Sequence, residues 1–282
     1  MMFKTLIDVN SLQALLAEPR LAVVDCRFDL MHPEAGQQAY LTGHIPGARY
    51  ADLNRDLSAP VGAHTGRHPL PSPEAFAAWL GAIGIGNDTQ VVAYDEANGS
   101  IAARLWWMLR WLGHGAVAVL DGGIKAWTAH GGALQAGEPA SRQAEHFTAR
   151  IDPNAVVSTA ELEHALRDPK TMLVDARAHE RYAGTVEPID PVAGHIPGAV
   201  NHPFTANLGP EAQFLSAAEL QRRWQERLEG RDPGNLVAMC GSGVTACHNL
   251  LSLEIAGVTG GKLYAGSWSE WIRDPRRPVA RG

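Results

Sequence analysis

Residues 23–27 read VVDCR and residues 43–49 read GHIPGAR, and both phrases return as LVDAR at residues 173–177 and GHIPGAV at residues 194–200. The copies lie about 150 residues apart in each case, which is the mark of an internal repeat. A chain of 282 residues also has room for two domains of ordinary size. We therefore predict a duplication, with two copies of one domain in tandem.

A third correspondence connects QVVAYDEANGSIAARLWWML at residues 90–109 with NLVAMCGSGVTACHNLLSLE at residues 235–254. In each segment a short apolar run leads through a small polar loop into an amphipathic stretch, the pattern of a strand followed by a helix. In this register Asp95 stands where Cys240 stands. Since the scaffold of the first copy does not need a thiol at that point, the comparison favours a chemical role for Cys240.

Short β-branched runs alternate with helical periods in both copies, which predicts an α/β class with central, mainly parallel sheets flanked by helices. Strands are expected near residues 21–26, 90–95, 117–120, 171–176, 235–240 and 262–265, a helix over residues 73–83 with Ser72 as N-cap, and helices after Ser158 and Ser216. The stretch at residues 130–154 lacks apolar periodicity. We therefore predict domains at residues 1–130 and 155–282, with a linker at residues 131–154.

Composition and charge exclude several classes of function. The net charge of −6 and a pI near 6.0 provide no basic stripe for nucleic acid. No apolar stretch reaches the ~20 residues of a membrane span, and the N-terminus does not resemble a signal peptide, so the cytoplasm is expected. The three cysteines are too few for a disulfide framework, and no Cys or His spacing suggests zinc. Neither a metal nor an organic cofactor is expected.

The loop after residue 239 has the composition of an anion cradle. A strand that ends before Cys240 and a helix that begins near Val244 would place the sulfur at a helix N-terminus, where amide N–H groups favour negative charge. Glycine allows backbone angles that turn successive N–H groups inward, and hydroxyl groups add donors. The candidate ligand-binding residues of the loop are Gly241, Ser242, Gly243, Val244 and Thr245.

Three reactions suit a thiolate in such a cradle. A tyrosine phosphatase loop has histidine before the cysteine and an arginine that clamps phosphate, whereas this chain has Met239 and Ala246 in those places. A Cys-His hydrolase needs a base, and nothing in the sequence connects a histidine to Cys240. Sulfur transfer needs only a nucleophilic thiolate and a cradle for the resulting persulfide anion. The loop meets that requirement by itself.

The ordered set of motifs resembles one known family. It comprises D-x-R and GHIPGA in both halves, YD at residues 94–95, WWMLR at residues 106–110, DGGIKAW at residues 121–127 and CGSGVTA at residues 240–246. This set is similar to that of the two-domain rhodanese sulfurtransferases over roughly residues 5–274. The resemblance implies two tandem rhodanese-like domains, of which the first, with Asp95 in place of cysteine, is catalytically silent.

The loop sequence CGSGVT resembles that of the members that use 3-mercaptopyruvate, whereas thiosulfate-using members typically carry CRKGVT. The resemblance implies that Cys240 takes sulfur from 3-mercaptopyruvate, releases pyruvate and passes the persulfide sulfur to cyanide or a thiol. A thioredoxin-like reductant is a further candidate partner. Thiosulfate sulfurtransferase is the alternative activity, and a persulfide carrier that docks a protein partner is the alternative of another class.

The resemblance also implies roles for three residues outside the nucleophile. Ser242 corresponds to a serine proposed to relay a proton, Arg181 to an arginine that binds the donor carboxylate, and His68 to a first-domain histidine that supports the serine. Two positions depart from the family pattern. The segment TVEPIDPVAGH at residues 185–195 lacks the usual second arginine, and Asn54 stands where an aspartate commonly partners the histidine.

Overall fold

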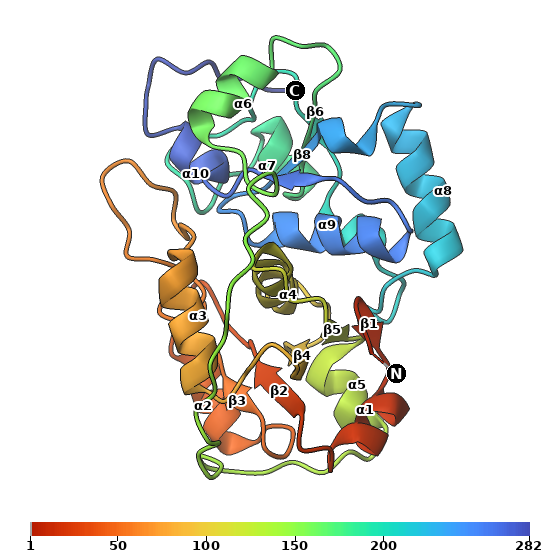
Figure 1. Cartoon of the computed structure of the whole chain (residues 1–282). Helices are drawn as coiled ribbons and strands as arrows, with labels where there is room; N and C mark the ends of the chain where they lie inside the picture. The colour runs from red at the N-terminus through yellow and green to blue at the C-terminus, as the bar shows by residue number, and fades with distance from the viewer. Residues whose placement is uncertain (1) are drawn as a thin grey trace. The chain divides into compact units, whose positions relative to one another are not determined.

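The computed structural model describes residues 2–282, and their contacts group the chain into two compact units (Figure 1). Unit 1 comprises the chain up to Ala59 together with Pro71–Asp152 and Pro210–Phe214, and unit 2 comprises Pro60–Leu70, Pro153–Gly209 and Leu215–Gly282. Each unit therefore contains one copy of the repeated phrases. Each also takes a short segment from the other half of the sequence.

Unit 1 is built on a parallel sheet of five strands in the order β1-β5-β4-β2-β3. The strands are β1 (Leu6–Ile7), β2 (Leu21–Asp25), β3 (Arg49–Tyr50), β4 (Gln90–Tyr94) and β5 (Val117–Leu120). Its helices are α1 (Val9–Leu15), α2 (Ala35–Thr42), α3 (Pro73–Ala82), α4 (Ala102–Trp111) and α5 (Gly123–Ala129). The strands predicted near residues 21–26, 90–95 and 117–120 are confirmed, whereas the two-residue strands β1 and β3 were too short to predict.

Unit 2 repeats this plan with a parallel sheet of four strands in the order β7-β6-β8-β9. Its strands are β6 (Met172–Asp175), β7 (Val200–Asn201), β8 (Leu236–Met239) and β9 (Lys262–Leu263). Its helices are α6 (Thr159–Ala165), α7 (His179–Ala183), α8 (Ala217–Leu228), α9 (Thr245–Ile255) and α10 (Ser267–Trp271), with the 3₁₀ turns η1 (Phe204–Asn207) and η2 (Pro233–Asn235). The three strands predicted for this half are confirmed, and β7 was not predicted.

The predicted helix starts are confirmed by their caps. The hydroxyl of Ser72 accepts the N–H of Ala75 at the start of α3, where Pro73 occupies the first helical position. Ser158 caps α6 in a reciprocal arrangement with Glu161, and Ser216 caps α8 through the N–H of Glu219. These local hydrogen bonds explain why the helix starts could be predicted from sequence.

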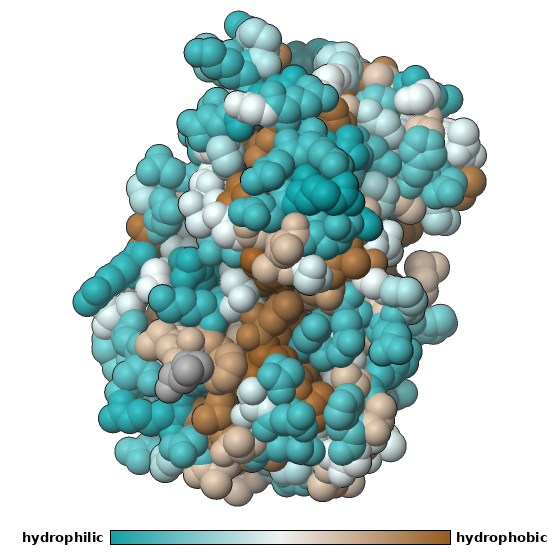
Figure 2. All heavy atoms as spheres, turned by 90° about the vertical axis from the view of Figure 1, so that its right-hand side faces the viewer, coloured by the Kyte–Doolittle hydropathy of each residue, from teal (hydrophilic) through white to brown (hydrophobic). Residues whose placement is uncertain are grey.

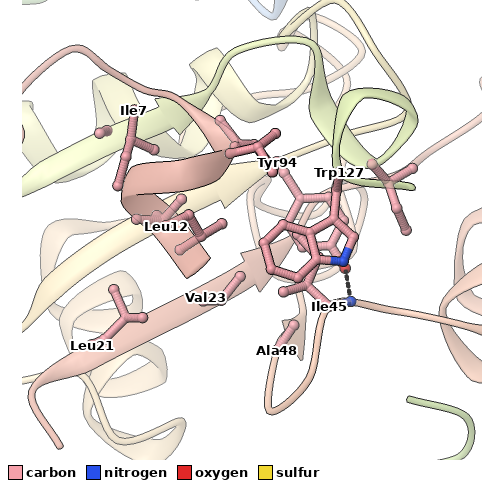
Figure 3. Packing of buried hydrophobic residues seen from close by; sticks show 13 residues of the cluster. Ile7, Leu12, Leu21, Val23, Ile45, Ala48, Tyr94 and Trp127 are labelled. Carbon is pink, nitrogen blue, oxygen red and sulfur yellow. Dashed lines mark hydrogen bonds between the residues drawn. The ribbon is translucent and has the colours of Figure 1, made fainter. Parts of the chain in front are cut away.

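The core of unit 1 lies between the sheet and helices α1 and α5. Figure 3 shows Leu12 of α1 and Trp127 of α5 packed against Val23 of β2 and Tyr94 of β4. The Tyr94 hydroxyl accepts the N–H of Ile45 at 3.2 Å, which fixes the GHIPGA segment against the same core. Successive residues of β2 and β4 are buried on both faces, as expected for strands that are covered by helices on both sides.

The two repeated phrases are connected by a buried ion pair in each unit. In unit 1 Arg27 donates to both carboxylate oxygens of Asp25 and, at 2.7 Å, to the carbonyl of Gly43. In unit 2 Arg177 donates in the same way to Asp175 and, at 2.7 Å, to the carbonyl of Gly194. D-x-R therefore holds the GHIPGA segment to the sheet in both copies, which is why the two phrases recur together.

Residues 131–152, predicted as part of a linker, belong to unit 1. Gln135 pairs with His44 through backbone hydrogen bonds of 2.9 Å in both directions, and the N–H of Glu145 donates to the carbonyl of Gly81 at 2.9 Å.

Figure 2 shows hydrophilic residues over much of one side of the surface, with hydrophobic residues gathered in patches between them. Among residues 2–282, none of the helices is long and apolar enough to cross a membrane.

Candidate active site

Cys240 is the first residue after strand β8, at the carboxyl edge of the parallel sheet of unit 2. Open parallel sheets bind their ligands at this edge. Helix α9 begins at Thr245, with Val244 as its N-cap residue, so the loop between strand and helix is only a few residues long. This arrangement matches the strand, loop and helix predicted around the cysteine.

The sulfur of Cys240 faces the backbone of its own loop. Its Sγ atom accepts the N–H of Gly243 at 3.1 Å and the N–H of Ser242 at 3.4 Å. The N–H of Cys240 donates in turn to the Ser267 hydroxyl at 3.0 Å. Cys240 is 2% exposed. The two amides are oriented to stabilise negative charge on a sulfur atom that little water reaches.

The two glycines of the loop serve different purposes. Gly243 has φ of +77°, and a Cβ atom there would lie 2.5 Å from the carbonyl oxygen of Ala265, so only glycine fits. Gly241 is not among the residues with positive φ. A Cβ on Gly241 would instead approach the guanidinium groups of Arg67, at 3.1 Å, and Arg181, at 3.5 Å. Glycine is therefore needed at position 243 for conformation, and at position 241 it leaves room for the two guanidinium groups.

The equivalent loop of unit 1 surrounds a buried carboxyl group, that of Asp95. One carboxylate oxygen of Asp95 accepts the N–H groups of Ala97 and Gly99, and the other accepts those of Ile101 and Ala102. Burial raises the pKa of Asp95, and the four amides act against that shift. The loop conformation of this fold is thus capable of enclosing a negatively charged group by backbone N–H groups alone.

His68 and Ser242 are joined by a hydrogen bond of 2.8 Å between Nδ1 and the hydroxyl oxygen, and both residues are buried. His68 belongs by sequence to the first half, but its segment Pro60–Leu70 packs with unit 2. The N–H of Arg67 donates to the Ser269 hydroxyl at 2.9 Å, and the N–H of Ser269 donates to the carbonyl of Gly241 at 2.9 Å. These bonds position the histidine beside the cysteine loop.

Arg181 lies in α7, and its guanidinium is held by two carboxylates. It donates to Glu187 at 3.0 Å through Nε and to Asp190 at 2.9 Å through Nη2. Although burial raises the pKa of Glu187, the hydrogen bonds and charge of Arg181 hold the pKa below its usual value. The guanidinium is therefore fixed next to Gly241, where an anionic ligand of the loop could reach it.

Among the residues of this site that were not predicted from sequence are Arg67 and Asp190. Nη1 of Arg67 lies 2.6 Å from Oδ1 of Asp190, and the other oxygen of Asp190 bonds Arg181. Arg67 directly precedes His68 in the sequence, so proximity to a proposed site residue was the one available signal. Asp190, within residues 185–195, is therefore bonded to both Arg67 and Arg181.

The other residues singled out from the sequence are the start of helix α9, the two further cysteines and Asn54. Val244 and Thr245 form the start of α9, so their N–H groups belong to the unpaired first turn of that helix. Cys247 is buried in α9 and donates to the carbonyl of Gly243 at 3.3 Å, while Cys26 follows β2 and burial raises its pKa. None of the three cysteines forms a disulfide bond. Asn54 lies in unit 1, where its N–H donates to Asp52 at 2.8 Å.

Acidic and sulfur-containing side chains do not form a metal site in the part of the chain that the structure describes. Within residues 2–282 no group of three or more His, Cys, Asp or Glu side chains is arranged to hold a metal ion. The polar groups near Cys240 are hydroxyl, imidazole, backbone N–H and two guanidinium groups that are paired with the carboxylates of Glu187 and Asp190. Such groups bind and orient an anionic substrate and move a proton.

Comparison with known proteins agrees with this architecture. The model of the rhodanese-like domain matches residues 8–130 and 158–274. A Pseudomonas aeruginosa protein named "Probable 3-mercaptopyruvate sulfurtransferase" is 53% identical over 98% of both chains. The "Thiosulfate sulfurtransferase" of Cricetulus griseus is 35% identical over 94% of this chain and 90% of its own.

Solved structures agree as well. The 3-mercaptopyruvate sulfurtransferase from Leishmania major superposes with a TM-score of 0.84 at 34% identity, covering 96% of this chain and 76% of that one. The matches extend over both units and over the repeated phrases of each half. The chain therefore belongs to the rhodanese family, as a two-domain rhodanese of the 3-mercaptopyruvate sulfurtransferase type.

Proposed function

We propose that this protein transfers sulfur from 3-mercaptopyruvate through a persulfide on Cys240 to cyanide or a thiol acceptor, with release of pyruvate. Cys240 is the nucleophile, Ser242 and His68 move the proton, and Arg181 binds the carboxylate of the donor. The loop residues Gly241, Gly243, Val244 and Thr245 surround the bound sulfur with backbone N–H groups. The loop of unit 1 carries Asp95 in place of a nucleophile, so in this proposal the first half contributes His68 and no second sulfur-binding cysteine.

The observation that carries the proposal is the pair of hydrogen bonds from Ser242 and Gly243 to the sulfur of Cys240. The carboxylate of Asp95 fills the sister loop with four N–H contacts. Of the N–H groups that the structure describes in the loop of Cys240, only those of Ser242 and Gly243 donate to the side chain, which has one sulfur atom in place of two carboxylate oxygens. The proposal is that a second sulfur atom attached to Cys240 binds to the N–H groups of this loop, as the carboxylate oxygens of Asp95 do in unit 1.

The first half-reaction follows from this geometry. The thiolate of Cys240 attacks the sulfur of 3-mercaptopyruvate, an S–S bond forms, and the C–S bond of the donor breaks. The electron pair of the broken bond leaves with carbon as the enolate of pyruvate, which takes up one proton. The persulfide loses the proton that the donor thiol carried and remains as an anion in the amide cradle. No external oxidant or reductant is needed.

Ser242 and His68 are placed to carry that proton. The 2.8 Å hydrogen bond allows the hydroxyl to give a proton toward the substrate while it accepts one from the imidazole, or the reverse. Both side chains are buried, so water competes little with the transfer. In the second half-reaction the acceptor attacks the outer sulfur, the S–S bond breaks, and the thiolate of Cys240 is restored.

The choice of donor rests on the loop and on Arg181. Gly241 and Ser242 carry no charge where the thiosulfate-using pattern CRKGVT carries two cations. The guanidinium of Arg181 next to Gly241 suits one carboxylate, and a relative of 53% identity bears the name of the mercaptopyruvate enzyme. Thiosulfate is the second candidate donor because arginine also binds it and because a relative is named for it.

The deciding experiment compares kcat/KM for 3-mercaptopyruvate and thiosulfate with cyanide as acceptor, and measures pyruvate alongside thiocyanate. We expect a clear preference for 3-mercaptopyruvate with one pyruvate per thiocyanate. A preference for thiosulfate would overturn the donor assignment. Stoichiometric sulfur on Cys240 without turnover would instead identify a persulfide carrier. A thioredoxin-like reductant as acceptor and a cytoplasmic location remain predictions.

A further inference from the structure

A groove of ≈ 530 Å³ lies in unit 2 beside helix α6 and the first residues of strands β8 and β9. Val156, Val157 and Val237 form apolar parts of its wall, and the last two are 9% and 4% exposed. Strand β8 begins at this groove and ends just before Cys240. The groove and the candidate active site therefore lie at opposite edges of one sheet.

The equivalent place in unit 1 is bridged by hydrogen bonds. The side chain of Gln90 accepts the N–H of Phe3 at 2.9 Å and donates to the carbonyl of Phe3 at 3.0 Å. In the second copy Asn235 stands for Gln90 and Pro153 stands for Phe3. Proline has no N–H and asparagine is one methylene shorter than glutamine, so this pair of bonds cannot form in unit 2. Asn235 and Pro153 line the groove instead.

The two copies align residue by residue around the groove. Helices α1 and α6 both contain seven residues and follow a capping side chain, Asp8 in unit 1 and Ser158 in unit 2. The pairs between neighbouring strands are equivalent as well, Val92 with Ala118 in unit 1 and Val237 with Lys262 in unit 2. Each side chain of the groove can therefore be compared with its counterpart in the first copy.

The comparison shows that basic side chains are particular to the second copy. Three of them line the groove, and each has an alanine as its counterpart in unit 1: His164 has Ala14, Arg167 has Ala17, and Lys262 has Ala118. The fold thus accepts alanine at all three positions. Their replacement by an imidazole, a guanidinium and an ammonium group needs a reason other than packing.

The two permanent cations of the groove are not neutralised by the protein. In the part of the chain that the structure describes, neither Arg167 nor Lys262 forms an ion pair. The carboxylates of the groove bond their own backbone, since Glu161 accepts the N–H of Ser158 at 2.8 Å and Asp168 accepts that of Lys170 at 2.9 Å. In a chain with a net charge of −6, this local pair of cations favours an anionic ligand.

We propose that this groove binds a small organic anion. Arg167 and Lys262 hold its carboxylate or phosphate group, and Val156, Val157 and Val237 contact its apolar part. Ligand sites combine apolar walls with a few polar groups in this way, and their usual volume of about 300–1,000 Å³ includes that of the groove. The site is additional to the sulfur chemistry and does not depend on it.

The test uses three probes of similar shape and isothermal titration calorimetry of the full chain. Phenylacetate carries a carboxylate, phenyl phosphate carries a phosphate, and phenylacetamide is neutral. We expect at least one of the two anions to bind the wild type with a Kd of about 1 mM or tighter, and the amide to bind about 10-fold more weakly. The tighter of the two anions identifies the class of the ligand. Lack of saturable binding by both anions would overturn the proposal.

Arg167→Ala and Lys262→Ala introduce the residue that unit 1 has at each position, so both variants should fold, as circular dichroism can verify. Each should weaken binding of the anion about 10-fold or more and leave binding of phenylacetamide unchanged. Lys170→Ala is the matched control, because it removes a neighbouring cation that does not line the groove. Equal losses in Lys170→Ala would show an effect of overall charge and contradict the site.

A further variant separates the groove from the candidate active site, where Arg181 also offers a guanidinium group to an anion. Arg181→Gln leaves the groove intact and should keep the binding that Arg167→Ala loses. If Arg181→Gln abolishes binding and Arg167→Ala retains it, the anion binds at the cysteine loop and the proposal is wrong. Because binding is measured without turnover, this result is independent of the sulfur donor.

Discussion

Nδ1 of His68 lies 2.8 Å from the hydroxyl oxygen of Ser242, across 174 positions of sequence. The serine is two residues from Cys240, and its own N–H donates to the cysteine sulfur. One residue thus contacts both the nucleophile and the imidazole. In the proposed mechanism Ser242 therefore connects the cysteine sulfur to the imidazole.

Ser242→Ala should lower kcat for 3-mercaptopyruvate by about 100-fold with a small change in KM, because a proton relay acts in the chemical step. His68→Gln should have a similar effect, and the double variant should be little worse than either single one, since the two groups act as a unit. Steady-state kinetics of the three variants provides the check. Full additivity of the two losses would show that the residues act separately.

Cys240→Ser should abolish sulfur transfer while the protein stays folded, because oxygen cannot form the persulfide. The mass of the wild-type chain should rise by about 32 Da after exposure to 3-mercaptopyruvate, and that of Cys240→Ser should not. Cys247→Ser is the matched control, because the Cys247 thiol is buried and donates a hydrogen bond to the carbonyl of Gly243. This variant should still gain the mass of one sulfur atom. Added mass on Cys240→Ser would place the nucleophile elsewhere.

Asp95→Ala should lower the free energy of unfolding by roughly 3 kcal/mol or more, because four backbone N–H groups would lose a buried acceptor. Asp95→Asn keeps one oxygen and should cost less. Urea unfolding measures both. Glu96→Ala is the control, since Glu96 is exposed and its ion pair with Lys125 is long, at 3.8 Å. Equal stability of Asp95→Ala and wild type would contradict the anion-cradle description of this loop.

Stability should decline in weak acid because of His202. Burial lowers the pKa of this histidine to about 4, below its ordinary value of 6.5, although its hydrogen bond to Asn207 acts in the opposite direction. The unfolded state therefore binds the proton more readily between these two values, and stability falls as pH drops from about 6.5 to about 4. The expected loss is on the order of 3 kcal/mol.

The measurement is urea unfolding at several pH values for the wild type and for His202→Gln, which cannot titrate at this position. The variant should show a smaller decline with pH, whatever its stability at neutral pH. His146→Gln, at an exposed histidine, controls for removal of one imidazole. Parallel curves for wild type and His202→Gln would exclude His202 as the cause.

Much of the architecture could be predicted from short-range patterns. The repeated phrases predicted two α/β units, and the β-branched runs predicted β2, β4 and β5 together with β6, β8 and β9. Caps such as Ser72 predicted helix starts because their hydrogen bonds join residues three apart. The two-residue edge strands β1, β3 and β7 escaped prediction, whereas β9, of the same length, was predicted because its segment lies in the second copy where the strand at residues 117–120 lies in the first.

The sequence by itself determined the duplication, the position of Cys240 between a strand and a helix, and the loop that surrounds its sulfur. Each of these depends on residues close together in the chain. Only the tertiary structure decided that Arg67 stands beside Arg181 over Gly241 and that Asp190 joins them. These contacts depend on where separate loops meet at one sheet edge, and the charge balance among them exists only once the fold has brought them together.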